Sequence, residues 1–215
     1  MRAFTIDKFN TWHDWRLTLT AKDVAPAEPK TNYVYLDGAH GSLDLTEALT
    51  GEVAYNDRTV TASFWTSEGT FNERLRVLQE IVSATHGRKV RIVEPDDPEH
   101  YFLGRVKVKS QKWDQVHMEL SLEATCEPWR YAIHETERVV KVSGDASVVI
   151  NNYGVNTLFP TLVVSGSVGV NVNGATRVLT NGTFQITDLK LRQGVNVVGV
   201  SGKGTLTFVY REASL

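Results

Sequence analysis

The 215-residue sequence has one cysteine, no long apolar run and no strong excess of charge of either sign. Because Cys126 has no second cysteine, an intrachain disulfide and an all-cysteine zinc site are excluded. Nothing requires an oxidising compartment, so we expect synthesis in a reducing cytoplasm. No run approaches the roughly 18 apolar residues that span a bilayer, and the N-terminal stretch lacks the apolar core of a signal peptide. We expect neither a membrane segment nor a secretion signal.

The formal charge of -2 and the pI of about 6.3 do not favour a polyanionic partner such as nucleic acid or an anionic membrane. One basic stripe exists, formed by Lys107, Lys109 and Lys112 in a predicted hairpin strand. Glu119 and Glu123 stand on the paired strand, so cross-strand charge pairing or a solvated face is favoured over contact with DNA.

Catalytic and metal-binding motifs are also missing. There is no G-x-S-x-G, and Cys126 in "LEATCEP" is predicted to be a small buried hydrophobic residue rather than a nucleophile. No two histidines have metal-ligand spacing, and nothing singles out a carboxylate pair for glycoside cleavage. We therefore expect no enzyme, no catalytic residue, no metal and no cofactor. The scattered histidines are His13, His40, His86, His100, His117 and His134.

Composition divides the chain in two. All five tryptophans precede residue 130, and residues 1–132 carry 16 basic against 20 acidic residues, whereas residues 133–215 carry 7 against 5. We place the boundary near "CEPWRYAIHETE", which predicts domains at 1–132 and 133–215.

The first domain is predicted to be α+β, with sheets dominating. Val60, Ala62 and Phe64 alternate as in a strand, and so do Met118, Leu120, Leu122 and Ala124. One helix is predicted over about residues 71–86, with a Thr70/Glu73 capping box and a stop at Gly87. Its apolar stripe is predicted to be Phe71, Leu75, Leu78 and Val82.

The second domain is predicted to be an all-β antiparallel sandwich of the galectin or carbohydrate-binding-module kind, without a helix. About eight short apolar runs alternate with turn residues after position 135. Asn173-Gly174 and Asn181-Gly182 predict hairpin turns, because both central positions of a type I′ turn need positive φ. The region has no tryptophan, so a sugar-binding aromatic platform is not supported.

Two polar segments are predicted to be exposed. Residues 22–32, "KDVAPAEPKTN", have the composition of an arm or loop. Residues 94–100, "EPDDPEH", are predicted to be a hairpin tip; Asp96, Asp97, Glu99 and His100 within it could hold a cation, but two prolines favour a solvated turn.

The stretch "DGAHGSLDLTEAL", residues 37–49, suits three interpretations. A calcium loop would need a ladder of alternating acids that is missing, and a phosphate loop would need a glycine pattern that does not occur. Tight turns at Asp37-Gly38 and Gly41 are favoured, with Asp44 or Thr46 bonded to nearby backbone amides.

The ordered motifs together resemble the distal tail protein (Dit) family of siphovirus-type phages and prophages. "TWHDWRLTLT" is similar to the family's T-x-x-D-W-x-L segment, and "CEPWRY" to its C-x-P-x-x-Y junction. The C-terminal segments "NNYGVNTLFPTLVVSG" and "GTLTFVYREASL" also match, although Arg16 and Ala213 stand where glycine is usual. The central motif matches at Lys30, Thr31, Asp37, Gly38, Gly41, Leu43, Asp44, Leu45, Thr46, Glu47, Tyr55 and Arg58.

The resemblance implies a structural virion protein, made in the bacterial host cytoplasm and placed at the tail tip. It implies a homo-hexameric ring formed by the first domain, which joins the major tail tube protein to the tail-associated hub protein. The second domain would be an attachment platform for receptor-binding proteins, and DNA would pass without being bound. The matched residues of the central motif would then serve assembly.

Closing a ring requires two different matching patches on each copy. We expect them in residues 22–32, 37–47 and 103–122. The alternative function is a carbohydrate-binding or cell-adhesion β-sandwich module.

Overall fold

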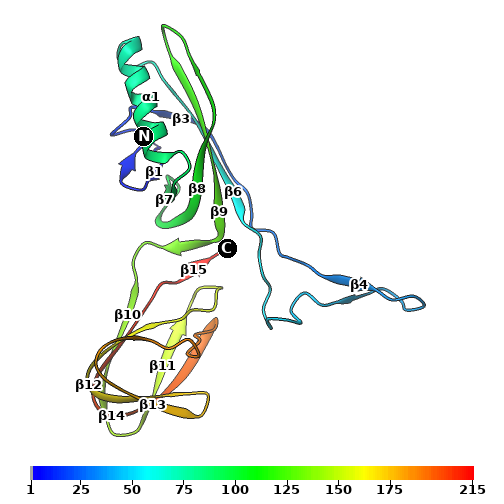
Figure 1. Ribbon diagram of the computed structural model, residues 1–215, viewed down its shortest axis with the longest axis vertical. Coiled ribbons are helices and arrows are strands. Elements are labelled where there is room, and N and C mark those ends of the chain that lie inside the picture. The colour runs from blue at the N-terminus through cyan, green and yellow to red at the C-terminus, as the bar shows by residue number, and fades with distance from the viewer. Residues whose placement is uncertain (1) are drawn as a thin grey trace. The chain divides into compact units, whose positions relative to one another are not determined.

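The computed structural model describes residues 2–215, which form two compact units. Unit 1 spans residues up to Arg130 together with Leu215, and unit 2 spans Tyr131–Ser214. Both consist mainly of antiparallel strands, and the described residues include a single helix, α1 (Phe71–Thr85), in unit 1 (Figure 1). The mainly β fold class with one helix is thus confirmed. No helix of the described chain combines the length and apolarity needed to cross a membrane.

The main sheet of unit 1 has the strand order β2-β1-β7-β8-β9-β6-β3. Its edge strands are short or irregular, whereas β6, β8 and β9 are longer, and buried residues alternate with more exposed ones along β6 and the first part of β9. The bounds are β1 (Thr5–Ile6), β2 (Phe9–Asn10), β3 (Thr18–Val24), β6 (Arg58–Thr66), β7 (Lys89–Glu94), β8 (Asp97–Trp113) and β9 (Met118–Ala132).

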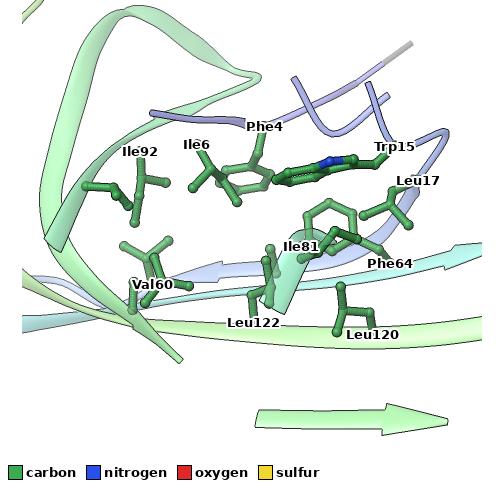
Figure 2. Close-up of a cluster of buried hydrophobic side chains, with 14 of the residues drawn as sticks. Phe4, Ile6, Trp15, Leu17, Val60, Phe64, Ile81, Ile92, Leu120 and Leu122 are labelled. Atoms are coloured by element: carbon green, nitrogen blue, oxygen red, sulfur yellow. The ribbon is translucent and has the colours of Figure 1, made fainter. Parts of the chain in front are cut away.

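The alternation predicted for β6 and β9 is confirmed, because the even-numbered residues of β6 and those of β9 from Met118 to Cys126 are buried. Phe64 pairs with Leu120 and Ala62 with Leu122, so the two strands present one continuous apolar surface. Figure 2 shows this surface with Phe4, Trp15 and Ile81 gathered against it. The core of unit 1 therefore lies between one face of the sheet, the N-terminal segment and α1.

Helix α1 begins with the predicted capping box. The Thr70 hydroxyl accepts a hydrogen bond from the Glu73 amide, and the Glu73 carboxylate accepts one from the Thr70 amide at 2.7 Å. The predicted stripe is rotated, however. The buried line runs through Arg74, Leu78, Ile81 and Thr85, while Phe71 is exposed. Arg74 is buried because its guanidinium donates to the carbonyls of Gly69 and Gln115, a pairing that periodicity of apolar residues cannot show.

Removing the cap should destabilise unit 1 measurably. We expect Thr70→Ala to lower its free energy of unfolding by about 1 kcal/mol, because the Thr70 hydroxyl no longer accepts from the Glu73 amide or donates to the Glu73 carboxylate. Urea titration followed by tryptophan fluorescence measures the change. Ser83→Ala is the control, since Ser83 is exposed in the last turn of the helix, away from the cap, and alanine is the better helix former. A Thr70→Ala midpoint equal to that of the control would contradict the assigned role of the cap.

Residues 25–57 leave the main sheet between β3 and β6 and form what we call the hairpin arm (Figure 1). It contains a separate two-stranded sheet of β4 (Tyr33–Tyr35) and β5 (Ser42–Asp44). Every residue from 28 to 44 is exposed. The predicted arm at 22–32 is therefore wrong at its start, because Lys22–Val24 belong to β3 and pair with Ala62–Val60 of β6.

Unit 2 is one curled sheet in which a few long strands replace many of the short ones that we predicted. The strand β14 (Gly194–Tyr210) pairs on one side with both β10 (Thr136–Ser143) and β11 (Ala146–Asn152), in a single uninterrupted register. On its other side lie β12 (Thr161–Val172) and then β13 (Ala175–Gln185). A short β15 (Ala213–Ser214) follows. The curled sheet encloses a core of mainly valine and leucine.

Glycines permit the curl. Gly202 has φ +95° and Gly166 has φ +101°, and a Cβ at Gly202 would lie 2.5 Å from the Ser167 carbonyl oxygen. A Cβ at the neighbouring Gly204 would meet the Ser165 carbonyl oxygen. The strands β12 and β14 thus approach at a point where a side chain has no space, which allows both to bend.

Of the two predicted Asn-Gly hairpins, one is confirmed and one is wrong. Asn173 (φ +52°) and Gly174 (φ +83°) form the turn between β12 and β13. Asn181-Gly182 instead lies inside β13, opposite a register shift in β12. The Asn181 side chain accepts a hydrogen bond from the Gly166 amide at 2.6 Å, so this asparagine stabilises the bend rather than a turn.

Candidate assembly surfaces

The hairpin arm contains most of the family-motif residues. Lys30, Thr31, Asp37, Gly38, Gly41 and Asp44 are all exposed, and Leu45 and Thr46 are half-buried at its base. Gly38 and Gly41 have φ values of +82° and +78°, as tight turns require. A Cβ at either glycine would meet open space, so these glycines are needed for backbone conformation and not for close packing within the chain.

Asp44 and Thr46 close the arm by short hydrogen bonds. The Asp44 carboxylate accepts from the Thr46 amide at 2.9 Å, and the Thr46 hydroxyl accepts from the Asn32 amide at 3.1 Å. The Thr46 hydroxyl also donates to the Asp44 carboxylate, and this bond together with the one from the Thr46 amide lowers the pKa of Asp44 below its ordinary value. The geometry agrees with the turn interpretation of residues 37–49. Nowhere in residues 2–215 do three or more histidine, cysteine, aspartate or glutamate side chains group as metal ligands would.

The arm exposes apolar side chains that its own chain leaves uncovered. Tyr35 is 81% exposed and Leu49 is 98% exposed, and Tyr33, Leu36 and Leu43 are each at least half exposed. A two-stranded hairpin without a packed face has little stability alone, and exposed apolar groups on this scale mark contact surfaces. The arm is therefore the strongest candidate interaction element among the described residues.

The last two motif residues lie at the base of the arm. The Tyr55 ring packs edge-on against Trp129, with 5.6 Å between centroids, and Pro29 forms an isolated bridge with Tyr55. Arg58 is 3% exposed, and its guanidinium lies 5.4 Å from the centroid of Phe102. Burial and the nearby Arg130 lower the pKa of Arg58. Through these contacts Tyr55 and Arg58 connect the base of the arm to the sheet. The sequence indicated that both belong to the motif but did not indicate these contacts.

The outward face of β6, β8 and β9 carries a second feature, a depression of about 360 Å³ that we call the outer-face pocket. Trp65, 40% exposed, lies beside hydroxyls from Thr20, Ser63 and Ser121. Lys112, Ser110, His117 and Glu119 complete the polar part of its lining.

The predicted charge pairing of the lysine stripe is confirmed for one acid. Lys107 and Lys109 both contact the Glu123 carboxylate, at 2.6 and 2.9 Å, and their charges hold the pKa of Glu123 below its ordinary value. Glu119 instead faces His117, at 3.7 Å. Two lysines on one carboxylate leave a surplus of positive charge, and no ion pair is seen for Lys112 with any residue in the range 2–215.

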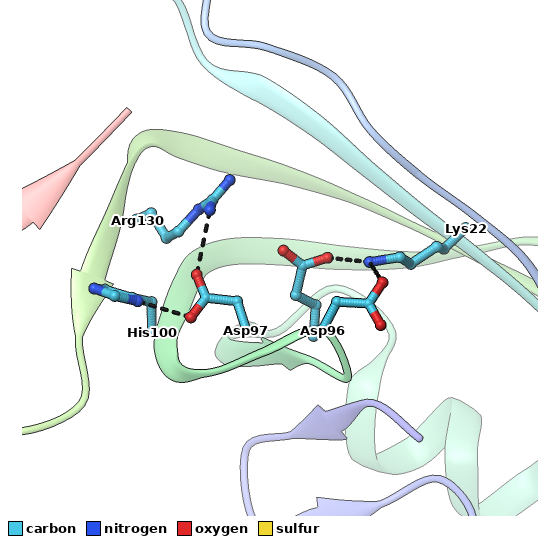
Figure 3. Close-up of polar contacts among 6 residues, drawn as sticks. Lys22, Asp96, Asp97, His100 and Arg130 are labelled. Carbon is cyan, nitrogen blue, oxygen red and sulfur yellow. Dashed lines mark hydrogen bonds and ion pairs between the residues drawn. The ribbon is translucent and has the colours of Figure 1, made fainter. Parts of the chain in front are cut away.

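The predicted tip at residues 94–100 forms the β7–β8 turn and carries two ion clusters (Figure 3). Lys22 of β3 contacts Glu94 and, at 2.8 Å, Asp96. Asp97 accepts from the His100 ring at 2.8 Å and from Arg130 at 3.2 Å. Glu94, Asp96 and Asp97 thus form ion pairs and hydrogen bonds within the protein, which favours a stabilising role for them over a cation site.

The Asp97 cluster should make stability depend on acid pH. Burial raises the pKa of Asp97, but the His100 hydrogen bond and the charges of His100 and Arg130 outweigh it, so the net pKa lies below 3.8. The resulting stabilisation is complete above about pH 4 and is lost as the pH falls through the lowered pKa. We expect Asp97→Asn to cost about 1 kcal/mol at pH 7 and less at pH 2, as measured by urea unfolding at both pH values. An equal loss at both would contradict the ionic origin.

Cys126 has the predicted character of a buried hydrophobic residue. Its side chain is fully buried against Gly104, and burial raises the pKa of the thiol to about 12. The thiol is therefore inert at neutral pH.

In unit 2, a depression of about 470 Å³ is lined by polar side chains that are already engaged. Asn196 bonds the backbone of Arg192, Asn171 accepts from the Gly174 amide, and Asp188 pairs with Arg177 at 2.9 Å. These groups stabilise their own loops, which leaves few of them for sugar hydroxyls.

We find no protein-family model and no curated protein that matches the sequence. Among solved structures, a conserved protein of unknown function from Pseudomonas aeruginosa PAO1 is 13% identical over 91% of this chain and all of its own, with a TM-score of only 0.27. The Dit protein (gp 19.1) of phage SPP1 is 15% identical, with a TM-score of 0.75 over 100% of both chains. That protein is described as a paradigm of the hub adsorption apparatus in phages that infect Gram-positive bacteria. The chain has the fold of a phage distal tail protein along its whole length.

Proposed function

We propose that the chain is a structural component of a phage tail tip and forms a homo-hexameric ring. In this proposal unit 1 closes the ring, which joins the tail tube to the tail-associated hub protein, and unit 2 provides the platform for host-adhesion proteins. The observation that carries it is the full-length match of fold to the SPP1 Dit protein. The role needs no substrate, no cofactor and no bound nucleic acid.

The exposed hairpin arm supports this function. A ring requires heterologous contacts, in which one patch of each copy meets a different patch of the next. The arm is long, apolar at its tip and uncovered by its own chain, so it is suited to be one of the two patches. Of the three segments that we predicted, 22–32 and 37–47 belong wholly or partly to it, and 103–122 forms much of β8 and β9.

The alternative, a carbohydrate-binding or adhesion module, has less support. Sugar sites combine an aromatic platform with free hydrogen-bonding groups. In unit 2 the polar depression is lined without any aromatic ring, and several of its polar groups are bound within their own loops.

Light scattering and negative-stain microscopy of the purified chain test the proposal. We expect a particle of six times the 24.0 kDa chain mass, seen as a ring with a central opening. The isolated tail tube protein should bind one end of this ring. A particle that stays monomeric at high concentration and with the tube protein present would overturn the proposal, and retention of a monomer on a glycan array would favour the alternative.

A further inference from the structure

The distribution of charge in unit 1 is uneven. The hairpin arm has one basic residue, Lys30, against six acids, whereas the rest of unit 1 has 15 basic residues against 14 acids. The net charge of the arm is therefore negative, whereas the net charge of the rest of unit 1 is slightly positive. The six acids are Glu28, Asp37, Asp44, Glu47, Glu52 and Asp57.

The two faces of the arm hairpin differ in chemistry. Pairing of Tyr33 with Asp44 and of Tyr35 with Ser42 puts two tyrosines and an acid on one face. Val34 and Leu43 form the other face, which is aliphatic. A surface that receives the tyrosine face should offer an aromatic ring, hydroxyl partners and positive charge.

The outer-face pocket meets all three requirements. Trp65 supplies an exposed ring, and Lys112 supplies a charge without an intrachain ion pair among the described residues. Ser110, Ser63 and Ser121 supply hydroxyls, of which the last two also bond each other at 3.2 Å. Glu119 also lines this pocket, but it faces His117, and Lys107 and Lys109 add positive charge along the same stripe.

The other depressions in unit 1 fit the tyrosine face less well. The one near the start of α1 is lined by Asp14, Glu68 and Glu73 together with Arg16 and Arg74. Its acids outnumber its bases, so it suits an acidic arm less well. The one along α1, between Leu75, Val82 and Trp113, contains no charged residue. Charge complementarity therefore selects the outer-face pocket.

We propose that the outer-face pocket is the receiving site for the arm of a second copy of this chain. Tyr35 packs on Trp65 there, and the arm acids face Lys112 and its neighbouring lysines. This inference rests on the proposed ring and names the second of its two patches. Donor and acceptor are different surfaces of one chain, so each copy offers one of each, as a closed ring requires.

Cysteine cross-linking tests the contact, because the native Cys126 is buried and unreactive. Two full-length variants, Ala39→Cys at the turn of the arm and Ser110→Cys, are mixed and treated with a short bismaleimide, so that Tyr35 itself stays in place. Both positions are exposed, so neither change should disturb folding. We expect a covalent dimer in the mixture and at least tenfold less in either variant alone. Gln79→Cys, which lines the depression along α1, replaces Ser110→Cys in the control mixture.

Charge exchange gives a second readout. Lys112→Glu should weaken association by about tenfold or more, and adding Asp37→Lys to the same chain should recover most of the loss. A ring of normal mass whose Ala39→Cys arm cross-links to Gln79→Cys, or to neither position, would overturn this docking site and leave the ring intact. The absence of any oligomer in the unmodified chain would overturn the proposed function as well.

Discussion

Gly204→Ala is expected to unfold unit 2 well below the melting temperature of the native chain. A Cβ at this position would meet the Ser165 carbonyl oxygen and lie 3.2 Å from the Gly166 Cα, so backbone, and not a flexible side chain, would have to move. Overpacking of this kind costs 1–3 kcal/mol and occasionally more, and we expect a loss of about 3 kcal/mol. For a unit of this size, that corresponds to a fall of roughly 12–24 °C.

Two spectroscopic signals separate the units in this experiment. All five tryptophans precede residue 130, so tryptophan fluorescence follows unit 1, whereas far-UV circular dichroism follows both units. We expect Gly204→Ala to shift only part of the dichroism transition and to leave the fluorescence transition in place. Gly199→Ala is the matched control on the same strand, because its Cβ would meet no backbone atom and would lie no closer than 3.2 Å to the Asn171 Cβ. Equal effects of the two substitutions would show that the Gly204 contact is not what permits the bend.

The two Asn-Gly pairs show what a local pattern can and cannot specify. Both favour positive φ equally, and the difference between them arises from β12, which has an extra residue opposite Asn181-Gly182 and turns tightly only at Asn173-Gly174. Strand pairing of this kind depends on residues far away in sequence, so a short motif does not contain it. For the same reason, runs predicted as separate short strands join into β12 and β13.

Helix α1 shows a second limit. Its ends follow from Thr70, Glu73 and Gly87, which are local signals, and the structure agrees with them. Its buried face is set by what it packs on. Arg74 is buried because carbonyls of Gly69 and Gln115 accept its protons, and Phe71 is left exposed as a result.

The arm was only partly predictable. "YVYLDG" predicts a strand followed by a turn, and both occur, but tyrosine and valine in a strand ordinarily indicate a buried or half-buried surface. Here Tyr33, Val34 and Tyr35 are exposed, because no element of their own chain covers them. A sequence pattern predicts that a side chain is buried, but it does not show whether the residues that bury it belong to the same chain or to another. Exposed apolar residues in a separate hairpin are thus an argument for assembly that only a structure supplies.

Removing the tip of the arm should therefore abolish the proposed ring and leave the fold intact. Asn32 and Leu45 are joined by a backbone hydrogen bond of 2.8 Å, so a short Asn-Gly turn can replace residues 33–44 without changing the base. Since β4 and β5 pair only with each other, the rest of the chain loses no strand partner. We expect light scattering to give the mass of a single chain, while circular dichroism and the urea midpoint stay within error of the native values.

A graded variant separates the side chains of the arm from its backbone. Tyr35→Ser with Leu36→Ser keeps the hairpin and removes two exposed apolar groups, and it should weaken ring formation without changing the unfolding midpoint. Val178→Ser is the matched control, because Val178 is 70% exposed but lies in unit 2. Ring formation by this variant should equal that of the native chain. In the proposed ring, both the apolar side chains and the charges of the arm contribute to the affinity between copies. Because salt screens only the charges, raised salt should weaken the native ring and the Tyr35→Ser/Leu36→Ser ring alike. Rings that persist after excision of residues 33–44 would assign closure to another part of unit 1 and make the exposed tyrosines a contact for a different protein.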